Sequence, residues 1–129
     1  MTIAEALRDA VHRLAAAGVK EAQKDARLLL SFALGRPKAF LFAHPEYKLS
    51  EEEQGSFDEA VHRRENHEPV QYITGRTEFY GLELIVSPAV LIPRPETEIL
   101  VENAVNALRG KTAPRFCEIG VGSGCISVS

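Results

Sequence analysis

The stretch from Arg115 to Val128 reads Arg-Phe-Cys-Glu-Ile-Gly-Val-Gly-Ser-Gly-Cys-Ile-Ser-Val, and it decides how the end of the chain folds. Its first residues, up to Ile119, are mostly apolar and predict a short strand. Glycines at 120, 122 and 124 then allow a tight backbone turn that a ligand can approach without meeting side chains. Cys125 begins a predicted helix. The order of strand, glycine loop and helix is typical of an α/β domain with a parallel sheet.

A parallel strand is normally covered on both faces, and residues 1–129 offer it no partner strand of this kind. We therefore expect residues 94–129 to be the beginning of an α/β domain that is truncated in this chain. A helix from Glu96 to Leu108, capped by Gly110, precedes the strand.

Residues 69–93 are predicted to form a β-hairpin linker. Apolar residues at 82, 84 and 86 lie within a run of β-forming residues, and Tyr80-Gly81 marks the turn. Prolines at 88, 93 and 95 then keep the chain extended.

Residues 1–68 are predicted to form a mainly α-helical bundle. Thr2 with Glu5, and Ser50 with Glu53, match the capping box that opens a helix. Apolar residues recur at helical spacing after the first box, and a glycine at 18 or 35 ends each of the first two helices. The expected helices run from Ile3 to just before Gly18, from Lys20 to Leu34, from Pro37 to about Phe42, and from Glu51 to about Asn66.

The composition fits a globular protein, with 45% hydrophobic and 26% charged residues. The net charge of −3 disfavours a strongly basic nucleic-acid binder. No apolar run approaches the ~20 residues of a membrane helix, and the N-terminus lacks the pattern of a signal peptide, so we expect a cytoplasmic protein. The histidines and cysteines show no metal-ligand spacing, and no metal is expected.

The loop is the first candidate site. An acidic residue two positions before Gly-x-Gly-x-Gly resembles the first motif of S-adenosylmethionine-dependent methyltransferases. In that motif the acid lies near the methionine amino group and the glycines line the ligand. A nicotinamide dinucleotide fingerprint would need glycine at 125, where this chain has cysteine, and a glycine-rich turn without ligand is a further alternative. The resemblance implies cofactor binding by Glu118, Gly120, Val121, Gly122, Ser123 and Gly124.

Four strings occur in one order along the chain: Glu68–Gly75, Glu78–Leu82, Ile92–Glu98 and the glycine loop. Together they closely resemble the bacterial peptide chain release factor N5-glutamine methyltransferases. The resemblance covers the whole chain and implies a helical substrate-recognition bundle, a hairpin linker and a Rossmann-like catalytic domain. The family often has threonine where Val121 stands. Its Asn-Pro-Pro-Tyr motif is absent from residues 1–129, so no catalytic residue is assigned.

The segment around Arg94 has two interpretations. Pro93 and Pro95 hold it extended, and acids in the first turn of the next helix favour the helix dipole, so a stiff linker explains it. Its close match to the family suggests instead that Arg94, Glu96 and Thr97 form part of the active-site wall.

The resemblance implies methyl transfer from S-adenosylmethionine to the side-chain amide of the Gly-Gly-Gln glutamine of a release factor. The release factor would be the partner of a monomeric enzyme, with no metal, nucleic acid or membrane involved. We expect residues 1–129 alone to be inactive. The alternatives are a DNA adenine-N6 methyltransferase, which the charge of −3 disfavours, a non-enzymatic helical interaction module, and a small dehydrogenase, which the glycine spacing disfavours.

Overall fold

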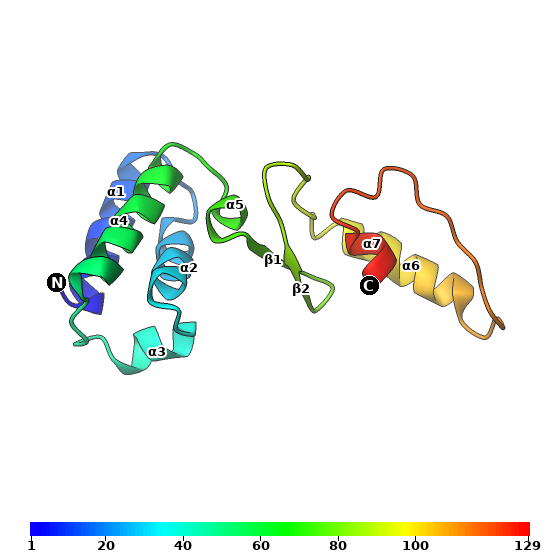
Figure 1. The fold of residues 1–129 in the computed structure, drawn as a ribbon, viewed down its shortest axis with the longest axis horizontal. Helices are drawn as coiled ribbons and strands as arrows, with labels where there is room; N and C mark the ends of the chain where they lie inside the picture. The colour runs from blue at the N-terminus through cyan, green and yellow to red at the C-terminus, as the bar shows by residue number, and fades with distance from the viewer. The chain divides into compact units, whose positions relative to one another are not determined.

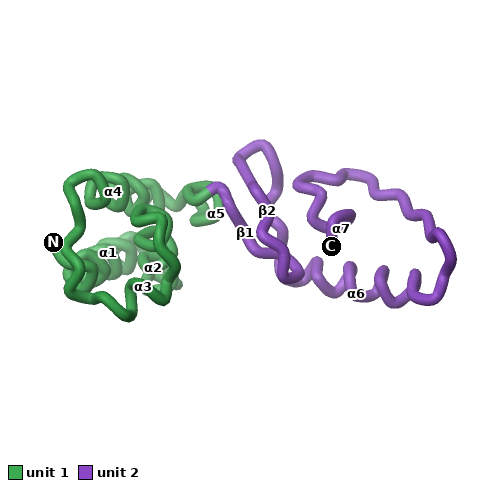
Figure 2. Tube along the Cα trace, turned by 60° about the horizontal axis from the view of Figure 1, so that its bottom comes forward, with its two compact units in different colours: residues 1–74 green, residues 75–129 purple.

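The computed structural model describes residues 1–129 as two compact units, Met1–Thr74 and Gly75–Ser129 (Figures 1 and 2). The first unit contains α1 (Ile3–Ala16), α2 (Ala22–Leu34), α3 (Lys38–Ala43), α4 (Glu51–Glu65) and α5 (Val70–Thr74). The second unit contains β1 (Arg76–Phe79), β2 (Leu82–Ile85), α6 (Thr97–Leu108) and α7 (Cys125–Val128). None of these helices combines the length and the hydropathy that a membrane-spanning helix needs.

Both predicted capping boxes are confirmed. The Glu5 carboxylate accepts the Thr2 N–H at 2.8 Å, and the Thr2 hydroxyl accepts the Glu5 N–H at 3.3 Å. Ser50 and Glu53 make the same reciprocal pair, at 2.8 and 3.2 Å. Each box satisfies two backbone donors that the first turn of a helix would leave unpaired. The starts of α1 and α4 are therefore fixed by local sequence.

Two helix starts differ slightly from the prediction. Lys20 and Glu21 form a turn, so α2 begins at Ala22. Pro37 is the N-cap of α3, with extended backbone, rather than its first helical residue. Proline suits either position because the first N–H groups of a helix have no intrahelical acceptor.

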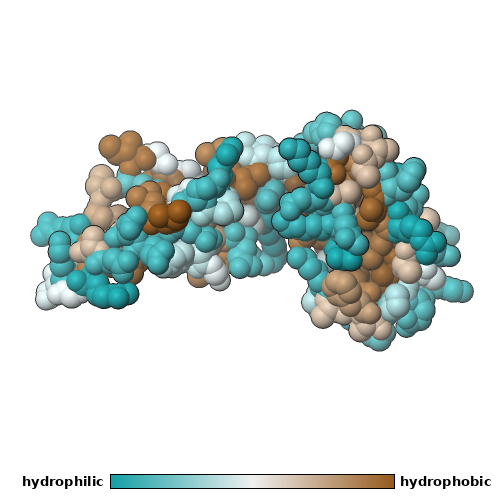
Figure 3. Space-filling model, turned by 180° about the vertical axis from the view of Figure 1, so that it is seen from behind, coloured by the Kyte–Doolittle hydropathy of each residue, from teal (hydrophilic) through white to brown (hydrophobic).

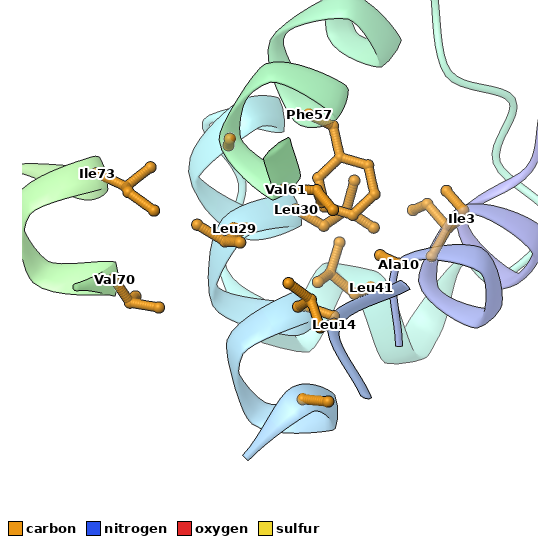
Figure 4. Close-up of a cluster of buried hydrophobic side chains, with 14 of the residues drawn as sticks. Ile3, Ala10, Leu14, Leu29, Leu30, Leu41, Phe57, Val61, Val70 and Ile73 are labelled. Atoms are coloured by element: carbon orange, nitrogen blue, oxygen red, sulfur yellow. The ribbon is translucent and has the colours of Figure 1, made fainter. Parts of the chain in front are cut away.

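One apolar core joins the helices of the first unit (Figure 4). The longest helices, α1, α2 and α4, pack against one another, and α3 packs against α2. Leu29, predicted to be in the core, is fully buried, as is the predicted apolar face of α4. The larger buried side chains are Ile3, Leu14, Leu29, Leu30, Leu41, Phe57 and Val61.

The helix α5 was not predicted, and it belongs to this core. Val70 and Ile73 are buried in the same cluster as the side chains of α1 to α4, and Figure 4 shows both pointing toward Leu29. Their separation of three residues places them on one side of a helical turn. The first compact unit therefore includes residues 69–74, which the sequence had placed in the hairpin linker.

The β-hairpin is confirmed, with its turn at Tyr80-Gly81. Phe79 pairs with Leu82, and the antiparallel register continues to Arg76 opposite Ile85. The turn residues have φ of 50° and 74°, as a two-residue type I′ turn requires. Glycine adopts this backbone freely, whereas Tyr80 does so against its preference.

The predicted strand at 115–119 does not form in this structure. The segment is extended without a strand partner, and Phe116 and Ile119 are 64% and 96% exposed. A strand exists through its hydrogen-bonded neighbour, and the only two strands, β1 and β2, pair with each other. The Rossmann-like sheet thus stays a prediction, while the helix expected at Cys125 is present as α7.

Candidate functional site

The glycine loop has a backbone that only glycine adopts readily. Gly120, Gly122 and Gly124 have φ of 71°, 57° and 77°, all in the left-handed region. A Cβ added at Gly120 would meet nothing within 4 Å, and one at Gly122 would lie 4.0 Å from the nearest oxygen. The glycines are therefore required by the direction of the backbone rather than by crowding.

Glu118 stands at the entrance of this loop. Its side chain is half-buried, and its Oε2 atom accepts a hydrogen bond from the Ser127 hydroxyl of α7. Within the loop, the Gly124 N–H donates to the Val121 carbonyl at 2.9 Å. These two bonds close the loop between the extended segment and α7. A carboxylate still has lone pairs free to accept hydrogen bonds from a ligand.

A cavity of about 490 Å³ lies between the loop and α6. Glu118 and Gly120 line it on one side, and the apolar face of α6, including Leu100 and Val101, lines it on the other. The structure thus brings the first part of the predicted cofactor loop to an apolar wall. The other predicted residues of the loop do not line the cavity; they are Val121, Gly122, Ser123 and Gly124.

The predicted wall residues lie at the start of α6, outside this cavity. Arg94 and Glu96 are exposed and Thr97 is half-buried. The Arg94 carbonyl accepts the Thr97 N–H at 3.0 Å, which turns the chain into α6. The structure does not bring these three residues to Glu118.

A link that the sequence did not reveal connects α6 to the hairpin. The Glu98 Oε1 atom accepts the backbone N–H of Tyr80 at 2.8 Å. From the sequence alone, Glu98 is only a favourable charge in the first turn of a helix. The link joins two of the strings that carry the family resemblance, Glu78–Leu82 and Ile92–Glu98. The carboxylate satisfies a backbone donor in the tight turn.

Ion pairs in the first unit connect the C-terminal end of α4 to α1 and α2. Arg13 of α1 binds Glu65 through two bonds of 2.9 Å. Arg64 donates through Nε to the buried Asp25 of α2 at 2.8 Å. The hydrogen bond from Arg13 lowers the pKa of Glu65 because it stabilises the ionised carboxylate. These contacts serve the packing of the bundle.

Arg63 makes a similar contact just beyond the end of α4. It binds Glu68 at 2.8 and 2.5 Å, and this hydrogen bonding lowers the pKa of that carboxylate. The pair holds the chain where it leaves α4 and turns toward α5. Nowhere in residues 1–129 do three His, Cys, Asp or Glu side chains come close enough together to hold a metal ion.

Comparison with known families shows to which family the chain belongs. The model of the PrmC N-terminal domain matches residues 5–75. The chain belongs to this family. The match to the PrmC N-terminal domain ends beside the boundary of the first compact unit, so it includes α5. The resemblance to the release factor glutamine methyltransferases is thereby confirmed for the N-terminal portion.

Curated relatives extend the similarity beyond the first unit. A release factor glutamine methyltransferase of Koribacter versatilis is 45% identical over 129 residues, which is the whole chain and 46% of that relative. One of Moorella thermoacetica is 40% identical, again over the whole chain and 46% of the relative. One of Clostridium botulinum is 38% identical over 113 residues, or 88% of the chain and 40% of the relative. The chain spans less than half the length of each.

Proposed function

We propose that this chain is the N-terminal part of a protein-(glutamine-N5) methyltransferase. Its substrate would be the glutamine of the Gly-Gly-Gln motif in a peptide chain release factor, and its methyl donor would be S-adenosylmethionine. The observation that carries the proposal is 45% identity to a protein named a release factor glutamine methyltransferase along all 129 residues, including the glycine loop. In this proposal the protein acts in the cytoplasm, as a monomer, with the release factor as its partner.

The chemistry of the loop fits the donor. S-adenosylmethionine would supply a methyl group already activated by its sulfonium, together with an ammonium group. Glu118 would hold that ammonium while keeping its bond from Ser127, because one carboxylate accepts several hydrogen bonds. The loop residues Gly120, Val121, Gly122, Ser123 and Gly124 would line the ligand with their backbone, which their open left-handed conformation supports.

The remaining parts would position the substrate. An amide nitrogen is a weak nucleophile, so the reaction depends on holding it in line with the methyl group. Residues 1–68 and the hairpin of residues 69–93 would recognise the folded release factor. Arg94, Glu96 and Thr97 would contribute to the wall of the active site, since the prolines on both sides of Arg94 restrict its backbone.

Replacing Gly122 in the whole protein tests the cofactor assignment. We expect Gly122→Val to abolish binding of S-adenosylmethionine in a calorimetric titration, because a β-branched residue does not tolerate a φ of 57°. Val121→Thr is the matched control and should bind normally, since backbone groups make the proposed contact. Normal affinity in Gly122→Val would overturn the assignment of the loop.

A methyl-transfer assay tests the substrate. The whole protein should transfer labelled methyl groups to a release factor, and a release factor with alanine in place of the motif glutamine should stay unlabelled. Duplex DNA containing adenine should also stay unlabelled. Labelling of the DNA in place of the protein would favour the DNA methyltransferase instead.

A further inference from the structure

A groove on the first unit runs along α1 and α2 and reaches the end of α3. Two adjoining cavities of about 250 and 220 Å³ form it, and both are lined by Leu7 and Arg27. On the right of Figure 3, a band of apolar surface lies on the bundle between hydrophilic margins. We call this feature the Arg27 groove and define it by Leu7, Arg8, Val11, Arg27, Phe42 and Pro45.

The charge of the Arg27 groove is of one sign. Arg8 and Arg27 are the only charged residues that line it, although acids outnumber bases in the chain as a whole. Two acids of α1 lie close to Arg8 in the sequence, but neither lines the groove: Glu5 binds Thr2 in the capping box, and Asp9 pairs with Arg13 at 3.7 Å. The groove therefore offers positive charge without a carboxylate of its own.

The arginines of the groove differ from those at the end of α4. Arg13, Arg63 and Arg64 all form ion pairs within the bundle. Arg27 forms none, and its guanidinium lies 5.0 Å from the centre of the Phe42 ring. A cation on an aromatic face keeps its hydrogen-bond donors free for a partner.

The apolar part of the groove is also open. Phe42 is 63% exposed, while Leu7 and Val11 are half-buried. Exposed aromatic and arginine side chains beside an apolar floor are typical of the centre of a protein interface. Surfaces that bind nucleic acid usually carry a longer row of basic residues than these two arginines, and the net charge of −3 further disfavours a nucleic acid as the partner.

We propose that the Arg27 groove docks an acidic, amphipathic segment of a partner protein. Carboxylates of that segment bind Arg8 and Arg27, and a bulky apolar side chain packs between Leu7 and Phe42. All of these residues lie in Met1–Thr74, and the proposal does not depend on the methyl-transfer activity.

A titration of the whole chain, followed by amide chemical shifts, tests the docking. The probe is a synthetic helical peptide with glutamates on one side and leucine and phenylalanine on the other. We expect shifts concentrated in α1, α2 and α3 that weaken as salt is added. Arg27→Ala and Phe42→Ala should each weaken binding about tenfold, as is usual for a central contact. The unfolding midpoint of each variant confirms that it is folded.

Lys20→Ala provides the matched control, because Lys20 is exposed in the same unit and does not line the groove. It should leave the affinity unchanged. Charge reversal sharpens the test: Arg27→Glu should lose the acidic peptide and gain affinity for a version in which lysine replaces glutamate. An absence of binding, equal weakening by Lys20→Ala, equal binding of a glutamine version of the peptide, or displacement of the peptide by single-stranded RNA would overturn the proposal.

Discussion

The two units of this chain bury apolar side chains to very different degrees. Sixteen hydrophobic residues of Met1–Thr74 form one buried cluster, whereas Gly75–Ser129 buries only Phe79, Val86 and Val101. In the second unit several large apolar side chains are exposed instead: Ile85, Leu91, Ile99, Leu100, Phe116 and Ile119. Burial of apolar surface is the main favourable term in folding, so the first unit carries its own stability and the second has much less.

The second unit has the more recognisable sequence, whereas the first unit has the more complete fold. Three of the four strings that resemble the methyltransferases lie in the second unit, and the glycine loop is one of them. The first unit is less distinctive in sequence, yet its helices have defined caps, a shared core and ion pairs. The more distinctive motifs are therefore those proposed to serve the cofactor, the substrate or the active-site wall, while the bundle follows from general rules of helix packing.

The largest effect should come from the core of the first unit. Leu29→Ala should lower the free energy of unfolding by about 2–5 kcal/mol, because the fully buried side chain leaves a cavity. Its neighbour Leu28 is only half-buried, so Leu28→Ala is the matched control and should cost less. Urea unfolding followed by circular dichroism measures both. Equal losses would mean that α2 does not present Leu29 to the core in the way described.

The buried ion pair should rank next. Asp25 is 6% exposed and binds Arg64, so Asp25→Ala leaves a guanidinium without its partner and should cost about 3 kcal/mol. The pair of Glu21 and Lys24 is exposed at the start of the same helix, and Glu21→Ala should cost at most about 1 kcal/mol. The same unfolding assay compares them. A small loss for Asp25→Ala would show that apolar packing alone holds α2 to α4.

Acid should weaken the first unit through its paired carboxylates. The pKa values of Glu53, Glu65 and Glu68 are lowered by hydrogen bonds from Ser50, Arg13 and Arg63 respectively. A carboxyl group with a lowered pKa in the folded state stabilises that state above its unfolded pKa, near 4.5. This stabilisation should fade as the pH falls from about 4.5 through the lower folded values.

Unfolding curves at neutral pH, pH 5 and pH 3 measure this loss. Glu65→Gln with Glu68→Gln removes two of the titrating groups and should flatten the dependence on pH. An unchanged slope in the double variant would assign the acid sensitivity to other carboxylates.

The sequence predicted the elements that depend on neighbours along the chain. The capping boxes, the glycine stop after α2 and the turn at Tyr80-Gly81 all involve contacts within a few residues. The helix α5 was missed because it is one turn long and is held by packing of Val70 and Ile73 on the bundle. Such burial leaves no periodic pattern in so short a segment.

The candidate site shows the same limit. The glycines at 120, 122 and 124 predict a tight turn, and their left-handed backbone agrees with it; Glu118 lies at the entrance of this loop. The strand at 115–119 was predicted from its composition. A strand also needs a hydrogen-bonded neighbour, and the sequence of one segment does not provide that neighbour. No local rule relates Glu98 to an amide eighteen residues earlier, so that contact became visible only in the structure.

The smallest effect should come from this contact in the second unit. Glu98→Ala removes the acceptor of the Tyr80 N–H and should cost about 1 kcal/mol, with faster hydrogen exchange at that amide. Glu98→Gln keeps an oxygen acceptor without the charge and should have a smaller effect. Glu96 is exposed beside it and makes no such bond, so Glu96→Ala is the control and should leave the exchange rate of Tyr80 unchanged. Unchanged exchange in Glu98→Ala would mean that the hairpin and α6 are not tied together, and that the unit from Gly75 onward is looser still than its small number of buried side chains indicates.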